Sequence, residues 1–192
     1  MSAAVLRLPD PCLVVLIGAA GAGKSTLAAR LFPPGAVLSS DAFRAALSGD
    51  EADQRVSRTA FAILHRELDR RLAKGRTTVV DATNVTPFAR RTLLRRALAL
   101  GIPAVAIVLD LDPALVLARN AARGGRVVPE AAVRRQLAEL HRSTRDGVLV
   151  AEGFAAVQLV RTADELEDLA IDQASRARDR PSVRPLSHRR SM

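Results

Sequence analysis

Residues 18–26 read Gly-Ala-Ala-Gly-Ala-Gly-Lys-Ser-Thr. The stretch has the spacing G-x-x-x-x-G-K-S, in which the backbone N–H groups of a glycine-rich loop surround phosphate oxygens. An apolar, β-branched run at residues 12–17 precedes it and predicts a buried strand. Apolar residues at helical spacing follow it, namely Leu27, Ala28, Leu31 and Phe32. This strand–loop–helix order distinguishes a phosphate-binding loop (P-loop) from a chance glycine-rich turn.

The lysine of this loop stands out in an arginine-rich chain. Of the 29 Lys and Arg residues, only Lys24 and Lys74 are lysines. A compact ammonium fits inside a ring of backbone N–H groups, whereas a planar guanidinium does not. We expect Lys24 to contact the β- and γ-phosphates and Ser25 to coordinate Mg²⁺. The nucleotide-binding residues predicted from this loop are Gly18, Ala19, Ala20, Gly21, Ala22, Gly23, Lys24, Ser25 and Thr26.

A dinucleotide-binding loop of the Rossmann type fits this sequence less well. The pattern G-x-G-x-x-G started at Gly21 meets Thr26, instead of glycine, at its last position.

Composition indicates one globular domain. The chain has 192 residues, of which 48% are hydrophobic and 26% charged, enough to build a substantial core. Its apolar runs are far shorter than the ~20 residues of a membrane span, and its first residues lack the pattern of a signal peptide. The single cysteine, Cys12, excludes an internal disulfide. We therefore expect a cytoplasmic protein with no membrane partner.

The net charge of +9 is unevenly distributed. Residues 173–192 hold six arginines and one aspartate, with prolines, serines and few large apolar groups, and are predicted to be a disordered basic tail. Two interpretations are open. The tail attracts nucleic acid non-specifically, or it is simply the solvated end of an arginine-rich protein.

Strand and helix patterns alternate along residues 1–172. Further strands are predicted at 36–39, 77–81, 104–109 and 156–160, and helices at 53–73, 87–100, 113–121 and 129–142. Such alternation predicts an α/β fold with a mostly parallel sheet flanked by helices. No linker interrupts the pattern, so residues 1–172 are expected to form one domain.

Asp41 follows the strand at 36–39, and carboxyl ends of parallel strands line the ligand crevice of such a sheet. Its carboxylate can accept the proton of an acceptor hydroxyl. It can instead serve as the N-cap of a helix around 42–47. Arg44 lies three residues on, on the same helical face, and can hold a phosphate of the acceptor or simply pair with Asp41.

Asp81 closes the strand at 77–81, as the acid of a Walker B motif does. It can orient Mg²⁺, through water, or it can be a turn former. Thr83 and Asn84 are expected at the rim of the crevice, as substrate-binding residues. Ala82 stands where a hydrolytic ATPase generally has a second acid, which favours transfer to a substrate over hydrolysis.

Arg119, Arg123 and Arg126 flank Gly124-Gly125 between two helices that start with proline. A glycine-hinged arginine segment can close over a phosphoryl group, expel water and neutralise charge. We therefore expect a lid over residues 119–142. The alternative is a solvated basic loop.

Several of these segments together resemble the 5′-hydroxyl polynucleotide kinase domain of bacterial RNA-repair enzymes. The matching stretches are 18–26, 38–44, 80–85, 118–126 and 152–154, in order over residues 11–160. The resemblance implies a P-loop kinase with a helical lid that transfers the γ-phosphate of ATP, with Mg²⁺, to a nucleic-acid 5′-hydroxyl end. It also implies that Asp41 is the general base and Arg44 contacts the acceptor phosphate, with Arg119, Arg123 and Arg126 as lid arginines.

Two other functions are kept open. A kinase on the same core can act on a small hydroxylated metabolite, a sugar or an antibiotic. A nucleotide-dependent switch or binding module can use the P-loop without any phosphoryl acceptor, but it leaves Asp41 without a task.

Overall fold

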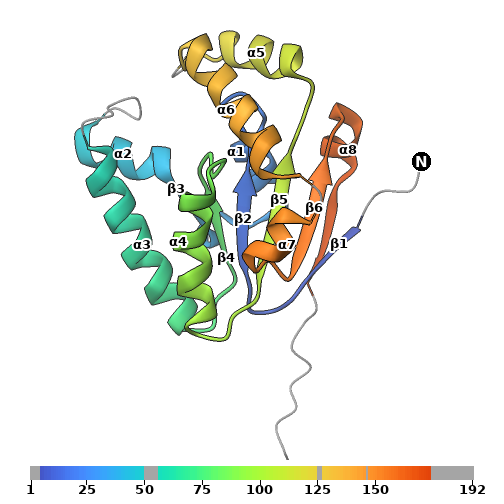
Figure 1. Ribbon diagram of the computed structural model, residues 1–192. Coiled ribbons are helices and arrows are strands. Elements are labelled where there is room, and N and C mark those ends of the chain that lie inside the picture. The colour runs from blue at the N-terminus through green and yellow to red at the C-terminus, as the bar shows by residue number, and fades with distance from the viewer. Residues whose placement is uncertain (1–4, 50–55, 125–126, 146, 174–192) are drawn as a thin grey trace, which may run out of the picture.

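Five parallel strands form the central sheet, in the order β3-β4-β2-β5-β6 (Figure 1). The computed structural model of the protein describes residues 5–49, 56–124, 127–145 and 147–173. The strands are β2 (Leu13–Ile17), β3 (Val37–Ser39), β4 (Thr78–Asp81), β5 (Ala104–Leu109) and β6 (Ala156–Val160). The predicted α/β fold with a mostly parallel sheet is thereby confirmed.

Strand β2 lies in the middle of the sheet, and all five of its residues are buried. Alternate residues point to opposite faces of a strand, so β2 contributes to two cores. Val14 and Leu16 belong to one hydrophobic cluster, and Leu13, Val15 and Ile17 belong to the other. A continuous apolar run is therefore required here, as in other parallel sheets covered on both faces.

Helices cover both faces of the sheet (Figure 1). Residues of α1 (Lys24–Leu31) and α5 (Pro113–Ala121) pack into the first cluster. Residues of α3 (Ser57–Ala73), α4 (Pro87–Leu98) and α7 (Val148–Glu152) pack into the second. Helix α6 (Glu130–Ser143) contributes Val133 to the first cluster and Leu140 to the second, because it crosses the end of the sheet.

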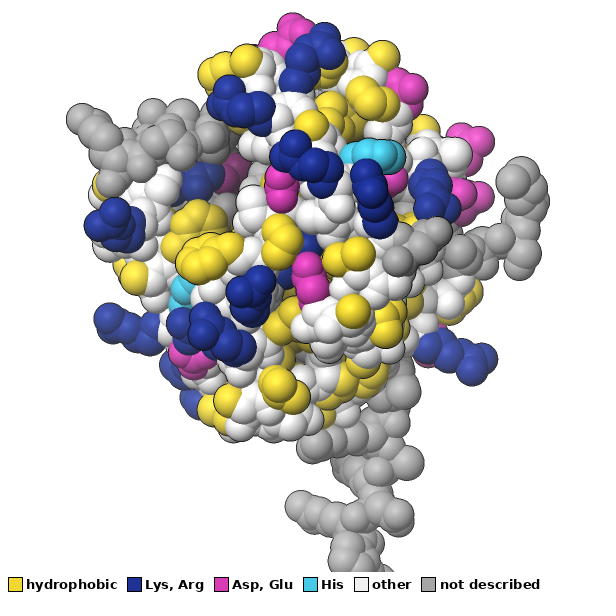
Figure 2. All heavy atoms as spheres, viewed as in Figure 1, with side chains coloured by type: hydrophobic (Ala, Val, Ile, Leu, Met, Phe, Trp, Pro, Cys, Tyr) yellow, Lys and Arg dark blue, Asp and Glu magenta, His cyan; other side chains and the backbone are white. Residues whose placement is uncertain are grey.

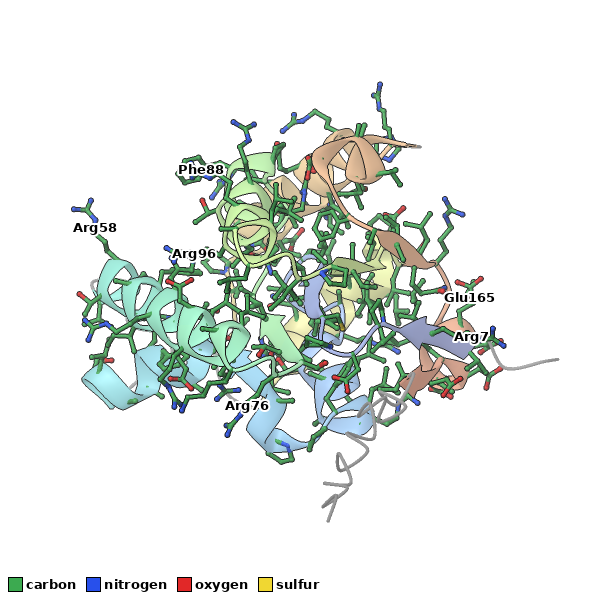
Figure 3. All side chains as sticks on the ribbon, turned by 90° about the horizontal axis from the view of Figure 1, so that it is seen from below. Arg7, Arg58, Arg76, Phe88, Arg96 and Glu165 are labelled. Carbon is green, nitrogen blue, oxygen red and sulfur yellow. The ribbon has the colours of Figure 1, made fainter. Side chains whose placement is uncertain are left out.

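Ionic contacts join neighbouring helices on the second face. Arg96 of α4 pairs with Asp69 of α3, at the place where the two helices meet in Figure 3. Arg58, by contrast, points outward from the beginning of α3 into solvent (Figure 3).

The register of the strands decides which residues meet at the carboxyl edge of the sheet. Leu16 of β2 lies beside Asp81 of β4, and Asp81 lies beside Ser39 of β3. The P-loop begins at Gly18, two residues after Leu16, and Asp41 follows two residues after Ser39. The chain therefore brings the P-loop, Asp81 and Asp41 to one edge, over which α5 and α6 lie (Figure 1).

A second, two-stranded parallel sheet was not predicted. Strand β1 (Val5–Leu8) pairs with β7 (Ala170–Gln173), in the register Val5 to Ala170. Leu6 and Leu8 of β1 are buried in the first core cluster together with Leu169. The prediction of a tail from residue 173 is wrong for Gln173, whose backbone ends β7, and residues 174–192 lie outside the described residues.

Other element boundaries differ modestly from the predictions. The helix expected over 53–73 runs from Ser57 to Ala73, and residues 53–55 lie outside the described part of the chain. The helix expected to end at residue 100 ends at Leu98. Two further helices complete the fold, α2 (Ser40–Ser48) and α8 (Ala163–Asp168), with a 3₁₀ turn at Pro34–Ala36. Among the residues described, no helix combines the length and the apolar character that crossing a bilayer demands.

Candidate active site

A cleft of about 690 Å³ opens at the carboxyl edge of the sheet. Its walls come from the P-loop, α2, the start of α3, the end of β4, and the helices α5, α6 and α8. The predicted residues that it brings together are Ala20, Gly21, Gly23, Lys24, Ser25, Thr26, Asp41, Arg44, Asp81, Thr83, Arg119 and Arg123. Arg126 lies outside the described residues.

The P-loop packs directly against α5. Gly21 has a φ of 88°, and a Cβ added there would lie 2.4 Å from the carbonyl oxygen of Val116. Only glycine combines a left-handed backbone with so close an approach to another helix. Gly23, with a φ of 94°, is the N-cap of α1, so the loop leads straight into a helix N-terminus. Such a terminus presents N–H groups and a positive dipole end to an anion.

Lys24 is almost fully buried beside the loop, with 8% of its surface exposed. Its Nζ donates a 2.8 Å hydrogen bond to the carbonyl oxygen of Ala19. Burial lowers the pKa of Lys24 from 10.5 to about 8, the Asp81 carboxylate opposes that shift, and the Arg123 guanidinium adds to it. A phosphate bound in the cleft would add negative charge beside this ammonium.

Ser25 and Asp81 form a pair of oxygen ligands. The Ser25 hydroxyl donates to Oδ2 of Asp81 at 2.7 Å, since β2 and β4 are neighbours in the sheet. A hydroxyl and a carboxylate are oxygen ligands of the kind that Mg²⁺ prefers, so Ser25 and Asp81 would hold that ion together with water and phosphate oxygens. Within the described ranges no group of three or more His, Cys, Asp or Glu residues is placed to hold a metal ion.

Asp41 lies in the first turn of α2, and it is not the N-cap of that helix. The cap is Ser39, whose side chain accepts a hydrogen bond from the Ala42 N–H. The alternative interpretation of Asp41 as a cap is therefore wrong. Its carboxylate forms an ion pair with the nearly buried Arg44, and both side chains line the cleft.

Thr83 and Asn84 differ in position. Thr83 lines the cleft, and its carbonyl oxygen accepts from the N–H of Gly18 at the start of the P-loop. Asn84 is buried, with a φ of 49°, and its side-chain amide donates to the carbonyl oxygen of Leu16 at 2.9 Å. The expectation of a rim position for Asn84 is corrected here, because the left-handed backbone turns the side chain inward to the sheet.

A fully buried arginine, Arg90, binds the loop that follows β4. Arg90 of α4 donates to both carboxylate oxygens of Glu152 at 2.7 Å. It also donates to the carbonyl oxygens of Asn84 and Val85, and to the hydroxyl and carbonyl oxygens of Ser143. One guanidinium thus joins α4, α6, α7 and the loop after β4.

The helix pair α5–α6 frames the side of the cleft where the arginines lie. Arg119 is on α5, and Arg123 follows the end of that helix. Asn120 is buried at the base of the intervening segment. Its amide donates to the carbonyl oxygen of Val128 at 2.7 Å and accepts from the Val128 N–H at 3.2 Å. These two bonds fix the start of the connection to its end.

Sequence reasoning missed several cleft residues, because they come from elements with no motif. Helix α8 contributes Leu166 and Glu167, and Arg30 of α1 holds that helix by donating to the carbonyl oxygens of Leu166 and Leu169. Gln136 of α6 also lines the cleft. In sequence it lies three residues after Val133 and four before Leu140, on the apolar face of an amphipathic helix, and a polar residue on that face was the signal that could have singled it out.

Residues 13–143 match the protein family described as an AAA domain. The chain belongs to the AAA domain family. The match covers the P-loop, Asp41, Asp81 and all of α6. The cleft residues of α1, α2, α3, β4, α5 and α6 therefore lie within the matched region. A comparison with curated proteins found no match.

Solved structures with the same fold include kinases. This AAA domain is similar to a chain of the Pnkp1/Rnl/Hen1 RNA repair complex, with a TM-score of 0.60 and 14% identity over 90% of this chain and 82% of that one. It is similar to a sugar kinase from Janibacter sp. HTCC2649, with a TM-score of 0.53 and 20% identity over 79% and 85%.

A third similar structure is the AvrRxo1-ORF1:AvrRxo1-ORF2 complex with sulphate ions. The TM-score is 0.65 and the identity 18%, over 80% of this chain and 55% of that chain. At these identities the likeness concerns the fold, which is that of a kinase-like P-loop protein.

Proposed function

We propose that this AAA domain is an ATP-dependent phosphotransferase whose acceptor is the 5′-hydroxyl end of a polynucleotide. The observation that carries the proposal is the shared cleft of Lys24 and Asp41. An ammonium that can bind phosphate and a carboxylate that can accept a proton, carried at the ends of two different strands of one sheet, are what transfer between a nucleotide and a hydroxyl requires.

The donor end of the cleft is built for a triphosphate. The P-loop N–H groups and the N-terminus of α1 bind the phosphate oxygens, and Lys24 reaches the β- and γ-phosphates. Ser25 and Asp81 would hold Mg²⁺, which supplies charge neutralisation between the phosphates.

Asp41 acts at the acceptor end. The acceptor hydroxyl gives its proton to the Asp41 carboxylate, its oxygen forms the new bond to the γ-phosphorus, and the bond from that phosphorus to the β-phosphate oxygen breaks to release ADP. The ion pair with Arg44 orients the carboxylate. Arg119 and Arg123, carried by α5 and the segment after it, act as lid cations that neutralise the transferring group.

Charge supports a polyanionic acceptor. Five cationic side chains and three carboxylates line the cleft. Arginines are also spread over the face formed by α3, α4 and α6, among acidic and hydrophobic side chains (Figure 2). Exposed examples are Arg66, Arg91, Arg95, Arg135 and Arg142. Positive charge of this kind attracts nucleic acid to the protein.

The test is a transfer assay with labelled ATP and Mg²⁺, offering a 5′-hydroxyl oligonucleotide, the same oligonucleotide with a 5′-phosphate, and small sugars. We expect label on the first substrate alone. Asp41→Asn should lower turnover about 10²–10⁴-fold and leave ATP affinity in place. Asp172→Asn, which alters an exposed carboxylate in the small sheet, is the matched control. If Asp41→Asn turned over as fast as the parent protein, Asp41 would not be the general base.

A small hydroxylated acceptor is the second candidate. It is favoured by the similarity to the Janibacter sugar kinase, whose fold resembles this one about as closely as that of the RNA repair chain does. Ionic strength separates the two, because polynucleotide affinity falls steeply with salt and that of a neutral sugar does not. Slow ATP hydrolysis that no acceptor stimulates would instead indicate a nucleotide-dependent switch.

A further inference from the structure

The peptide group between Ala19 and Ala20 is hydrogen-bonded at both of its polar atoms. Its carbonyl oxygen accepts from Nζ of Lys24 at 2.8 Å. Its N–H donates to Oε1 of Gln136 at 2.8 Å, across 116 residues of sequence. The lysine of the P-loop and a glutamine of α6 therefore flank one peptide plane.

Gln136 and Lys24 line the same cleft, in which the proposed function places the terminal phosphate of the nucleotide. Lys24 is expected to reach the β- and γ-phosphates, and its ammonium and the Gln136 amide bind opposite edges of one P-loop peptide group. Gln136 also lines the cleft, on the wall formed by α6.

The orientation of the amide follows from the chemistry of its partner. Because the Ala20 N–H is a donor, only the oxygen of the glutamine amide can face it, and the nitrogen must point elsewhere. Among the hydrogen bonds of the described residues, none uses Nε2 of Gln136. Its two N–H donors are therefore free to meet an anion in the cleft.

Resting on the proposed function, we infer that Gln136 is a catalytic residue that donates from Nε2 to an oxygen of the transferring γ-phosphoryl group. Oε1 holds the P-loop at Ala20 while Nε2 binds the phosphoryl oxygen, so the side chain joins α6 to the nucleotide only when a third phosphate is present. A donor fixed in place before the reaction stabilises the charge that develops during it.

Two substitutions separate this role from that of a mere brace. Gln136→Glu keeps an acceptor for the Ala20 N–H but replaces both donors with an anionic oxygen. Gln136→Leu removes acceptor and donors together. The control is Arg135→Ala, which alters the exposed neighbour on the same helix.

The experiment measures the affinities of each variant for Mg·ATP and Mg·ADP by calorimetry, kcat for transfer, and the thermal midpoint. We expect both Gln136 variants to lose at least about tenfold in ATP affinity relative to ADP, with about 10²–10³-fold lower kcat and little change in the thermal midpoint. Arg135→Ala should match the parent protein.

Several outcomes overturn the inference. A Gln136→Glu protein that behaves like the parent while Gln136→Leu fails would assign Gln136 to bracing alone. If the ratio of ATP affinity to ADP affinity were unchanged in both variants, Gln136 would not contact the γ-phosphate. If the parent protein binds ATP but phosphorylates no acceptor, the proposed function fails, and the affinity ratio still tests Gln136. A parent protein that binds neither nucleotide overturns both.

Discussion

The Ser25 hydroxyl donates a 2.7 Å hydrogen bond to Oδ2 of Asp81. The first residue belongs to the P-loop after β2 and the second ends β4, so a pair of adjacent strands fixes the distance. Both oxygens would bind Mg²⁺ in the proposed reaction, so removing either side chain should impair the same step.

Ser25→Ala and Asp81→Asn are each expected to raise the Mg²⁺ concentration needed for half-maximal transfer by roughly 10–100-fold. The double variant should need no more Mg²⁺ than the more impaired single variant, because losing either ligand already disrupts the shared metal site. A magnesium titration of activity checks this. Additive losses in the double variant would show that the two residues act separately.

Nucleotide binding should take up a proton in mildly alkaline solution. Burial lowers the pKa of Lys24 to about 8 in the free protein, and neighbouring phosphates raise it again on binding. Near pH 8.5 the free lysine is mostly neutral and the bound one charged, whereas near pH 6 both are charged. Calorimetry in buffers of different ionisation enthalpy measures the uptake. Equal enthalpies in all buffers at pH 8.5 would rule out this titration.

The same pKa gives a stability trend in the absence of nucleotide. Between about pH 8 and 10.5 the unfolded chain holds a proton on Lys24 that the folded protein has released. The free energy of unfolding therefore rises with pH across that window because of this group, and below about pH 8 the contribution is absent. The comparison is between the parent protein and Lys24→Met in urea unfolding, where the variant should lose this rise.

Gly21→Ala should damage both stability and nucleotide binding. The left-handed backbone costs about 1–2 kcal/mol for a residue with a Cβ, and the Val116 carbonyl oxygen 2.4 Å away adds a clash. Gly35→Ala is the matched control, since a Cβ there meets nothing within 4 Å. Urea unfolding and ATP titration should separate the two variants, and equal behaviour would contradict the close packing of the P-loop on α5.

Arg90→Met should lower the free energy of unfolding by about 3 kcal/mol, toward the lower end of the range for broken buried pairs. The reason is that Glu152, whose side chain is 19% exposed, keeps some contact with water after losing its partner. Adding Glu152→Met should restore part of the loss, because no unpaired carboxylate remains. Arg91→Met, on the exposed side of the same helix, should change little.

Much of the site was predictable because parallel strands align their carboxyl ends. Asp41 and Asp81 were both placed beside the P-loop by that rule, and the register of β3, β4 and β2 agrees. What the rule lacks is side-chain direction. Asn84 follows Asp81 closely in sequence, yet its positive φ turns it into the sheet, and one sequence carries no mark of that turn.

Long-range contacts between unremarkable residues were also beyond prediction. Gln136 contacts the P-loop because α6 crosses the end of the sheet. Strand β1 pairs with β7 although the two lie at opposite ends of the described chain. Four-residue strands such as these carry too few residues for periodicity to stand out.

The pairing of β1 with β7 has a practical consequence for anyone shortening the protein. Leu6 and Leu8 of β1 are buried in the first core cluster, Leu8 with 1% of its surface exposed, and β7 is the strand that pairs with β1. A version truncated before Ala170 would expose the unpaired backbone edge of β1 to solvent, and such an edge can pair with another copy of the chain. Shortened versions made to aid crystallisation should therefore keep both strands or remove both together.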